Sequence, residues 1–395
     1  MKETKIEEAR KHLKEIRADG WLLYDFHRNN LLAHVFLEIP QKNIVTRRFF
    51  YWIPTHGEPI KIVHAIEPYI LDHCPGKKIV YSSWQLMEKA LSDVLKGSKR
   101  IVMEYSPKNA IPYVSRVDAG TVDFVRSLGA EVVSSAEILP YFTAVMDEKQ
   151  AASHQSAAKG VKQVAEETWK WIAWHLKNQK TLTEYDVQQK VESDYVKLHL
   201  ITDHSQIVAV NAHSADPHYI PQKNSSSPIK KGDFILLDIW AKENHDWAIY
   251  GDITRVAVAA ERPTEKQQKI FSIVRKAQIA ATELVKERFA HKKRIEGWEV
   301  DDAARNVIRK AGYGDFFIHR TGHNIERELH GSGAHMDNLE MHDVRPILPS
   351  TCFSIEPGIY LPGEFGVRLE YDLYVHQDGT VEISGGEQDE IVCLL

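Results

Sequence analysis

Two apolar segments in the C-terminal half of the chain each contain a single aspartate. Asp238 lies within the sequence FILLDIW and Asp252 within AIYGDITRV, and the polar segment Lys242–Asp246 between them is typical of a hairpin loop. The two carboxylates are therefore expected to lie close together on neighbouring strands. Buried carboxylates are costly unless they are protonated, paired with cations or bound to metal. The pattern leaves three interpretations open: neutralisation by Arg255 or Lys242, exposure of one aspartate to water, or a metal site.

Two further acids and a histidine follow in the same half of the chain. Glu356 ends the apolar run FSI, Glu370 lies inside the β-like sequence GVRLEYDLYV, and His323 follows a glycine in TGHNI. Carboxylate-rich sets suit hard ions such as Mn²⁺, with imidazole as a borderline ligand. Two divalent ions would balance the charge of these four carboxylates. We therefore predict a two-metal site, which explains all these buried polar residues together.

Histidines are concentrated near this site. The chain has 20 histidines, and His319, His323, His330, His335 and His342 fall within a short stretch. The spacing of His319 and His323 does not make a zincin helix, because that motif needs a glutamate where Arg320 stands and because Gly322 interrupts the helix. For single histidines, a capped loop or a hydrogen bond to a core carbonyl remains the alternative to a role in chemistry.

The ordered set resembles a known enzyme family. Asp238, Asp252, Gly322-His323, Glu356-Pro-Gly and Arg368-Leu-Glu370 are similar to the motifs of the pita-bread metallopeptidases, the group of methionine aminopeptidase, Xaa-Pro aminopeptidase and prolidase. The resemblance covers residues 150–395 and implies an α+β fold, in which a pita-bread (creatinase/aminopeptidase) catalytic domain is preceded by a smaller α/β domain like the creatinase N-terminal domain. It implies two divalent metal ions, Mn²⁺ first and Zn²⁺, Co²⁺ or Fe²⁺ as alternatives. The metal ligands that it implies are Asp238, Asp252, His323, Glu356 and Glu370, with Asp252 and Glu370 bridging.

The resemblance also implies roles on the substrate side. His218 and His330 match the two substrate-side histidines of the family, and His319 matches a further histidine of the Xaa-Pro aminopeptidase and prolidase branch. Arg368 is expected to orient a ligand or to anchor a substrate carboxylate, and Tyr360 to donate to a substrate carbonyl.

The implied reaction is metal-dependent hydrolysis of peptides with proline in the second position, as an Xaa-Pro aminopeptidase or an Xaa-Pro dipeptidase. A metal-bridging hydroxide would attack the scissile carbonyl, and Glu356 would act as acid and base. Another metal-dependent reaction on the same scaffold, such as a lyase acting on a small carboxylate, is the closest alternative. A metal-free creatinase-like hydrolase and a non-catalytic binding module are disfavoured because all five ligands are present.

Two departures from the family pattern affect the expected site. The spacing from Asp238 to Asp252 is longer than usual, which predicts a longer hairpin loop. Asn324 and Glu326 replace glycines of the common Gly-His-Gly-Ile-Gly pattern. Their bulk is expected near the substrate pocket, where it would change the pocket's shape.

The elements that must position these residues follow from periodicity. Residues 1–147 are predicted to form an α/β domain, with helices at 6–16, 83–96 and 122–128 and strands at 21–24, 48–53, 60–63, 101–103 and 132–133. Residues 148–395 are predicted to form the catalytic domain. Its helices are expected within 148–178 and from residues 183, 264 and 300, and its strands at 234–240, 248–259, 353–360 and 367–375.

Composition excludes several protein classes. The chain has 395 residues, 43% of them hydrophobic, and 50 basic against 55 acidic residues, which argues against a general nucleic-acid binder. No apolar run approaches the roughly 18–20 residues that span a bilayer. The charged start is unlike a signal or transit peptide. Cys74, Cys352 and Cys393 share no metal-type spacing and are expected to be reduced thiols of a cytoplasmic protein. A homodimer is expected from the resemblance alone.

Overall fold

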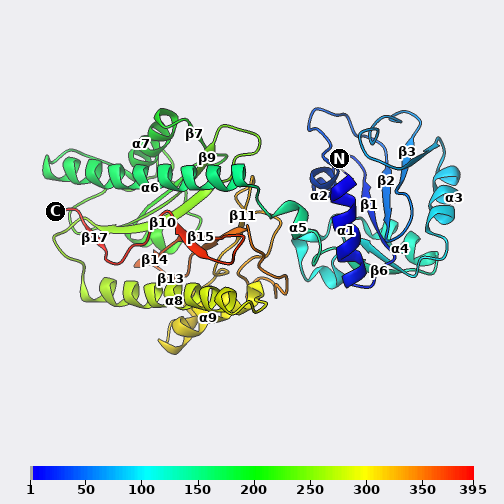
Figure 1. The fold of residues 1–395 in the computed structure, drawn as a ribbon. Helices are drawn as coiled ribbons and strands as arrows, with labels where there is room; N and C mark the ends of the chain where they lie inside the picture. The colour runs from blue at the N-terminus through cyan, green and yellow to red at the C-terminus, as the bar shows by residue number, and fades with distance from the viewer. Residues whose placement is uncertain (1–2) are drawn as a thin grey trace. The chain divides into compact units, whose positions relative to one another are not determined.

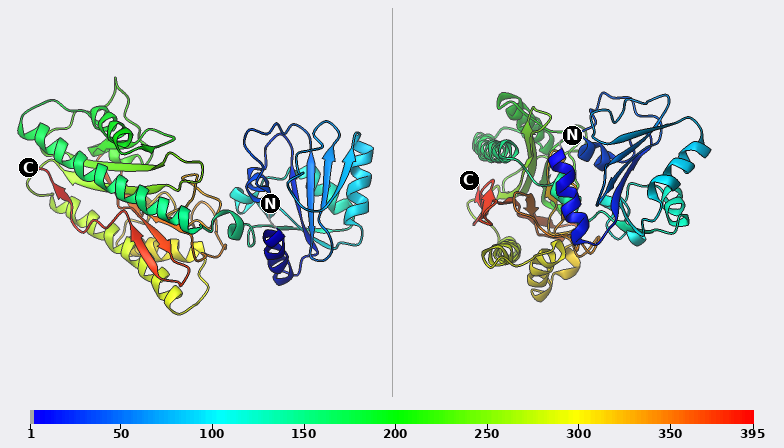
Figure 2. Two further views of the ribbon diagram at one scale, coloured as in Figure 1. Left: turned by 45° about the horizontal axis from the view of Figure 1, so that its top comes forward. Right: turned by 45° about the vertical axis from the view of Figure 1, so that its right-hand side comes forward.

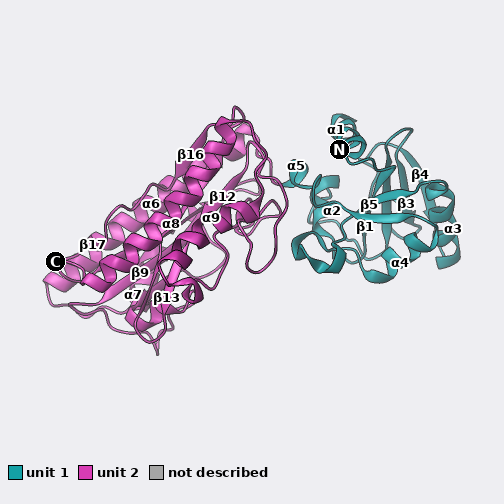
Figure 3. Cartoon of the chain, turned by 90° about the horizontal axis from the view of Figure 1, so that it is seen from below, with its two compact units in different colours: residues 1–143 teal, residues 144–395 magenta. Residues whose placement is uncertain are grey.

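The computed structural model describes residues 3–395 (Figure 1). The chain divides into two compact units, residues 1–143 and 144–395 (Figure 3). The sequence pattern puts the change a few residues later, at Asp147, which is the N-cap of the first helix of the second unit. That residue forms a capping box with Gln150, so helical periodicity begins only beyond it.

Unit 1 is built on a mixed sheet with the strand order β4-β3-β2-β1-β5-β6. The predicted strands near residues 48–53 and 60–63 are observed as β2 (Phe49–Pro54) and β3 (Ile60–His64), which pair antiparallel with Phe50 opposite Ile62. The β1–β5, β3–β4 and β5–β6 pairs are parallel. The strands are β1 (Gly20–Asp25), β2 (Phe49–Pro54), β3 (Ile60–His64), β4 (Lys77–Tyr81), β5 (Arg100–Met103) and β6 (Glu131–Ser134).

Helices cover both faces of this sheet, as expected for an α/β unit (Figure 1). The buried side chains of α3 and α4 share a core with alternate residues of the strands, while α1 and α2 contact β1 on its other face. Ser83 and Asp118 cap α3 and α4 by accepting backbone N–H bonds. The helices are α1 (Glu3–Glu15), α2 (Leu31–Leu37), α3 (Trp84–Leu95), α4 (Ala119–Ser127) and α5 (Pro140–Thr143), with 3₁₀ turns η1 (Pro107–Asn109) and η2 (Pro112–Val114).

Unit 2 places strands between two layers of helices. Figures 1 and 2 show α6 and α8 on opposite faces of the strands. The predicted helix starts at Thr183 and Thr264 are confirmed, since each threonine forms a capping box. The helices are α6 (Glu148–Lys177), α7 (Glu184–Lys197), α8 (Glu265–Ala290) and α9 (Gly297–Lys310), with 3₁₀ turns η3 (Asn211–Ala215) and η4 (Gly314–Phe316).

Three small sheets form the middle of unit 2. The first has the order β17-β10-β9-β7, with β8 also paired to β9, the second is β11-β12-β15-β16, and the third is the hairpin β13-β14. Their strands are β7 (Leu200–Ile201), β8 (Ile207–Val210), β9 (Phe234–Glu243), β10 (Gly251–Val258), β11 (Asn324–Ile325), β12 (Cys352–Ile355), β13 (Gly358–Leu361), β14 (Phe365–Arg368), β15 (Tyr371–Val375), β16 (Val381–Ser384) and β17 (Val392–Cys393).

One close approach fixes α6 against β10. A Cβ atom at Gly251 would lie 2.5 Å from the backbone nitrogen of Ala158, so only glycine allows this helix to pack so near the strand. An apolar core lies between α6, α7 and the strands β8, β9 and β10, and a second core lies between the strands and α8 and α9. The two layers hold β9 and β10 rigidly, and these strands carry Asp238 and Asp252.

The two C-terminal strands predicted as continuous are each interrupted. The predicted strand 353–360 is observed as β12 and β13, with Glu356 and Pro357 between them. The predicted strand 367–375 is observed as β14 and β15, with Leu369 and Glu370 between them. The prediction of continuous strands was wrong because the chain changes sheets at both points: β12 pairs with β15, while β13 pairs with β14. Glu356 and Glu370 therefore both lie at points where the chain passes from one sheet to the other.

Within residues 3–395, no helix is both long enough and apolar enough to cross a bilayer. The cysteines are unbonded, as predicted: Cys74 and Cys352 are buried and Cys393 is exposed.

Candidate functional site

The two strand aspartates lie on the same face of neighbouring strands. In the β9–β10 ladder, Asp238 is opposite Thr254 and Asp252 is opposite Trp240, so the two carboxylates are diagonal neighbours. The threonine lies between two of the acids, because its Oγ1 is 2.9 Å from Oδ1 of Asp238 and 2.6 Å from Oε2 of Glu370. The proximity predicted from the hairpin is confirmed.

Three of the predicted ligands form a tight buried group. Asp252, His323 and Glu370 each offer one ligand atom, and these atoms lie within 4.8 Å of one another. Nε2 of His323 is 3.6 Å from Oδ2 of Asp252 and 3.5 Å from Oε1 of Glu356. Nδ1 of His323 is 3.3 Å from the carbonyl of Asn324, which leaves Nε2 directed at the acids. The structure thus brings Glu356 to the edge of the same group.

A cation already contacts the fourth acid. Arg368 donates from Nη2 to Asp238, from Nε to Thr254 at 3.0 Å, and from Nη1 to the hydroxyl of Tyr360 at 2.9 Å. The interpretation that Arg255 or Lys242 neutralises the aspartates was wrong. Arg255 bonds to backbone carbonyls, among them those of Gly385 and Gly386, and Lys242 to the carbonyl of Arg327. Neither aspartate is exposed to water, since Asp238 is 7% and Asp252 3% exposed.

The pKa values of the grouped acids reflect their burial. Burial, with repulsion from Asp238, raises the pKa of Asp252 far above its usual value. Burial, with repulsion from Asp252, does the same to the pKa of Glu370. The pKa of Glu356 rises to about 7, mainly through burial, while nearby Arg368 opposes the rise. Burial also lowers the pKa of His323 well below its usual value, so its imidazole is neutral.

These residues fit divalent metal ions. Among the described residues, Oδ1 of Asp252 and Oε1 of Glu370 are buried without a hydrogen-bond partner, although buried carboxylate oxygens are normally satisfied. If all four carboxylates are ionised, their negative charge exceeds the positive charge of Arg368 in a desolvated space, which is why their pKa values are raised without metal. Oxygen ligands with one imidazole are the donors that Mn²⁺-like ions take. A divalent cation would satisfy the unpartnered oxygens and remove the repulsion that raises the pKa values.

A hydrogen-bonded chain runs from Arg368 through Tyr360 to His319. Nε2 of His319 lies 2.7 Å from the hydroxyl of Tyr360, and Nδ1 lies 2.7 Å from the carbonyl of Arg320. Since Nδ1 donates to that carbonyl, Nε2 accepts from Tyr360. Burial, with the charge of Arg368, lowers the pKa of His319 to about 3. The structure therefore joins His319, Tyr360 and Arg368 in one hydrogen-bonded chain that ends at Asp238.

The two other predicted substrate-side histidines lie at the rim. The rings of His330 and His323 are edge to face, with 4.3 Å between their centroids. Burial, with the charge of Arg320, lowers the pKa of His330 to about 4. His218 is exposed and its side chain makes no described bond to the acids. Its neighbour Pro217 accepts a bond of 3.4 Å from Arg368, which brings this loop to the edge of the group.

Sequence reasoning missed several residues that support the site. Asp372 accepts the backbone N–H of Asp252 at 2.9 Å and lies in a buried group with His154 and Cys352. Asp301 accepts the backbone N–H of Thr321 at 2.9 Å and its hydroxyl at 2.7 Å. Asp372 could have been noticed as a further acid in an apolar segment, whereas Asp301 lies in the charged sequence EVDDAAR. Thr254 could not have been noticed, because its role follows from the strand register.

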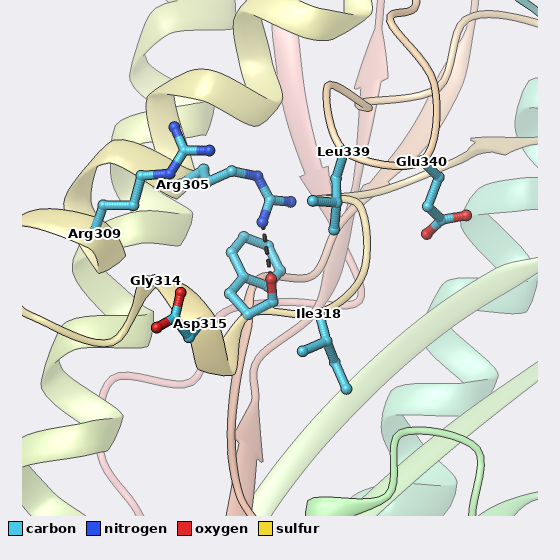
Figure 4. Close-up of a pocket in the computed structure, with 8 residues that line it drawn as sticks. Arg305, Arg309, Gly314, Asp315, Ile318, Leu339 and Glu340 are labelled. Atoms are coloured by element: carbon cyan, nitrogen blue, oxygen red, sulfur yellow. Dashed lines mark hydrogen bonds between the residues drawn. The ribbon is translucent and has the colours of Figure 1, made fainter.

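One cavity lies outside this group of acids. It has a volume of about 690 Å³ and lies where α9, η4 and the segment around Glu340 meet (Figure 4). None of the five predicted ligands lines it. Arg305 in its wall donates to the carbonyls of Phe317 and His319 at 2.9 and 2.8 Å. This cavity therefore borders the segment that carries His319 but offers no acid of the group to a ligand.

Comparison with known proteins agrees with this geometry. The model of metallopeptidase family M24 matches residues 152–377. The chain is 34% identical over 183 residues to the Xaa-Pro dipeptidase of Pyrococcus furiosus, a match of 46% of this chain and 48% of that protein. Such matches span about half the length of the curated relatives.

Solved structures match over almost the whole chain. Dipeptidase PepE from Mycobacterium ulcerans has a TM-score of 0.70 at 20% identity and covers 99% of this chain and 97% of its own. An X-prolyl aminopeptidase from Caenorhabditis elegans, described as a cytosolic enzyme with a di-nuclear active site, has a TM-score of 0.62 at 16% identity and covers 96% and 61%. These likenesses establish the two-part fold with a pita-bread catalytic unit. The family model covers more than half of the sequence, and the chain belongs to metallopeptidase family M24.

Proposed function

We propose that this protein is a dinuclear-metal-dependent hydrolase of peptides with proline in the second position. The observation that carries the proposal is the buried group of Asp252, His323 and Glu370, with unpartnered oxygens on both acids, in a member of the M24 family. The names of relatives such as the Pyrococcus furiosus Xaa-Pro dipeptidase favour dipeptides over longer peptides as substrates.

The residues that would hold two ions are those singled out from the sequence: Asp238, Asp252, His323, Glu356 and Glu370. When bound, two divalent ions lower the pKa of a water molecule and polarise a carbonyl oxygen. Mn²⁺ is our proposed ion, because the donors are mostly carboxylate oxygens. We propose Asp252 and Glu370 as the bridging pair, a role supported by the unpartnered oxygen that each has in one desolvated group.

Glu356 is the proposed acid and base. Its Oε1 lies 3.5 Å from Nε2 of the proposed ligand His323, which places the carboxylate within the group where water and substrate would exchange protons with it. Ser354 donates to Oε1 of Glu356 at 3.1 Å and so holds the carboxylate in place. The proton taken from water would pass through this carboxylate to the leaving nitrogen.

Arg368, Tyr360 and the three histidines are proposed to handle the substrate. The chain from Arg368 through Tyr360 to His319 holds the guanidinium of Arg368 in place beside the acids. His330, neutral at physiological pH, and the exposed His218 lie at the rim, where they would orient the peptide. Prolyl recognition itself is inferred from the relatives' names, because no described residue accounts for it.

The test is mass spectrometry of products after Mn²⁺-loaded protein meets Ala-Pro, Ala-Pro-Ala and Ala-Ala-Ala together. Cleavage of Ala-Pro alone identifies a dipeptidase, and release of alanine from Ala-Pro-Ala identifies an aminopeptidase. A Glu356→Gln variant is the matched control and should cleave neither. Absence of cleavage by protein with two bound ions per chain would overturn the proposal.

We further propose that the protein is a cytoplasmic homodimer and that unit 1 is a creatinase/prolidase-like N-terminal domain. Unbonded cysteines and the description of the Caenorhabditis elegans neighbour as cytosolic support the location. Light scattering coupled to gel filtration tests the dimer, with a mass near twice 45.2 kDa expected.

A further inference from the structure

The two residues that replace family glycines turn away from the acids. Oδ1 of Asn324 accepts the backbone N–H of Gly333 at 2.8 Å, and its Nδ2 donates to the carbonyl of Cys352 at 2.9 Å. Oε1 of Glu326 accepts the N–H of Ser332 at 2.8 Å, its hydroxyl at 3.1 Å and the N–H of Gly333 at 3.2 Å. Both side chains are therefore bonded to the loop of residues 326–333, which we call the His330 loop.

The backbone of the His330 loop packs directly on these two side chains. A Cβ atom at Gly331 would lie 2.7 Å from Cδ of Glu326 and even closer to Oδ1 of Asn324. At Gly333 a Cβ atom would lie 2.7 Å from Cγ of Asn324. Glycine at positions 331 and 333 therefore allows the loop backbone to lie against the side chains of Asn324 and Glu326.

The loop acts on the site through His330. The ring of His330 lies edge to face with that of the proposed ligand His323. Burial raises the pKa of Glu326 to about 7, so above this pH its carboxylate accepts the two backbone N–H groups and the hydroxyl more strongly than a neutral acceptor would. Glu326 therefore fixes the part of the loop that directly follows His330.

We propose that Asn324 and Glu326 are positioning residues, which hold the His330 loop so that His330 faces the substrate site beside His323. This inference rests on the proposed function. It goes beyond it because neither side chain bonds to a proposed metal ligand, and because the glycines at these positions in the family pattern cannot make the bonds. The bulk expected to change the shape of the pocket is bonded to the loop.

Kinetics on Ala-Pro with Mn²⁺ tests the route through His330. Glu326→Ala should lower kcat/KM about tenfold, the loss expected when charge-assisted bonds that fix one side chain are removed. Glu326→Gln, which keeps an acceptor oxygen, should restore activity to within about threefold. The control is Glu328→Ala, because Glu328 lies in the same loop with an exposed side chain. It should stay within about twofold of the wild type.

A double-mutant cycle then separates positioning from general damage. If Glu326 acts through His330, adding Glu326→Ala to His330→Ala should change kcat/KM by less than about twofold. A tenfold loss of kcat/KM from Glu326→Ala in both the wild type and the His330→Ala variant would overturn the proposal. A folded Glu326→Gln variant that does not recover activity would also overturn it.

Hydrogen exchange gives a readout independent of activity. The amide of Ser332 should exchange about tenfold faster in Glu326→Ala than in the wild type. Its exchange should be unchanged in Glu328→Ala, while the amide of Gly333 keeps its bond to Asn324 in both variants. Unchanged protection in Glu326→Ala would refute the anchoring. Inactive wild-type protein combined with lost protection in Glu326→Ala would refute the proposed function while supporting the anchoring, so the two failures are distinguishable.

Discussion

The guanidinium of Arg368 donates a hydrogen bond to the carboxylate of Asp238, beside the group that contains Asp252 and Glu370. Both partners are almost fully buried, with side-chain exposures of 4% and 9%. One acid of the proposed metal site thus has a permanent cation, whereas Asp252 and Glu370 have unpartnered oxygens. The site therefore has two electrostatic halves, one neutralised by the protein and one that needs an external cation.

Removal of Arg368 should be costly and partly rescued by metal. Arg368→Ala leaves Asp238 buried without its cation, and loss of one partner of a buried pair costs about 3–5 kcal/mol of unfolding free energy. Because Mn²⁺ can supply positive charge to the same carboxylates, the loss should be smaller in Mn²⁺ than in chelator. Urea unfolding in both conditions measures this. Arg262→Ala, which removes an exposed arginine, is the control and should change stability by less than about 0.5 kcal/mol. Equal losses for Arg368→Ala with and without metal would contradict the shared electrostatics.

The metal-free protein should lose stability as the pH rises from about 4 to above 7. Asp252, Glu356 and Glu370 have raised pKa values, so the folded state holds their protons more tightly than the unfolded state does. Stability contributed by such groups is present at low pH and is lost as the pH passes from the unfolded to the folded pKa. Glu356, with a pKa of about 7, accounts for a loss on the order of 3 kcal/mol.

Urea midpoints between pH 5 and pH 8 in chelator would measure this slope. Mn²⁺ should flatten it, because bound cations stabilise the ionised acids, and Asp252→Asn should flatten it without metal. A chelated wild-type protein as stable at pH 8 as at pH 5 would disprove the expectation.

Gly322→Ala should displace His323. A Cβ atom at Gly322 would overlap the carbonyl oxygen of Ser354, while Ser354 also bonds the backbone of His323 in both directions at 2.9 and 3.0 Å. We expect a loss of about 3 kcal/mol in unfolding free energy and of most Mn²⁺ binding, measured by calorimetry. Gly120→Ala is the matched control, because a Cβ there meets only Oδ1 of Asp118 at 3.3 Å. Intact metal binding in Gly322→Ala would show that the backbone can yield there.

Asp301→Ala should destabilise the protein through a buried arginine. Asp301 bonds Arg305 one helical turn away at 2.7 and 2.9 Å, and both side chains are at most 2% exposed. The single variant should lose about 3–5 kcal/mol, whereas Asp301→Leu with Arg305→Met should lose less, because no unpaired charge remains. Urea unfolding compares them, and a double variant worse than the single one would refute this account.

Much of the site was accessible from the sequence because its signals are local. An acid inside an apolar strand is visible as an exception, and a polar segment between two such strands predicts their pairing; both held for Asp238 and Asp252. Capping boxes at Thr183 and Thr264 likewise depend on residues three apart, and both helix starts were predicted. These predictions depended only on residues that are close together in the sequence.

The predictions that were wrong concerned contacts between residues far apart in the sequence. Arg368 reaches Asp238 across 130 positions of sequence, so no local pattern distinguishes it from Arg255, which was considered instead. The breaks at Glu356 and Glu370 were invisible because apolar alternation continues through them, and only the pairing of separate sheets ends the strands. The direction of Asn324 and Glu326 depends on a loop that returns to them from residues 331–333.

The hairpin of β13 and β14 begins just after Glu356 and ends just before Glu370. Its tip, residues 362–364, is therefore separated from both acids by the full ladder of paired strands. Changes in the length of this tip would be absorbed at the turn, while the two acids keep their places at the base. The tip is thus a suitable position for inserting a fluorophore tag or a short epitope, which would report on the enzyme without altering its chemistry.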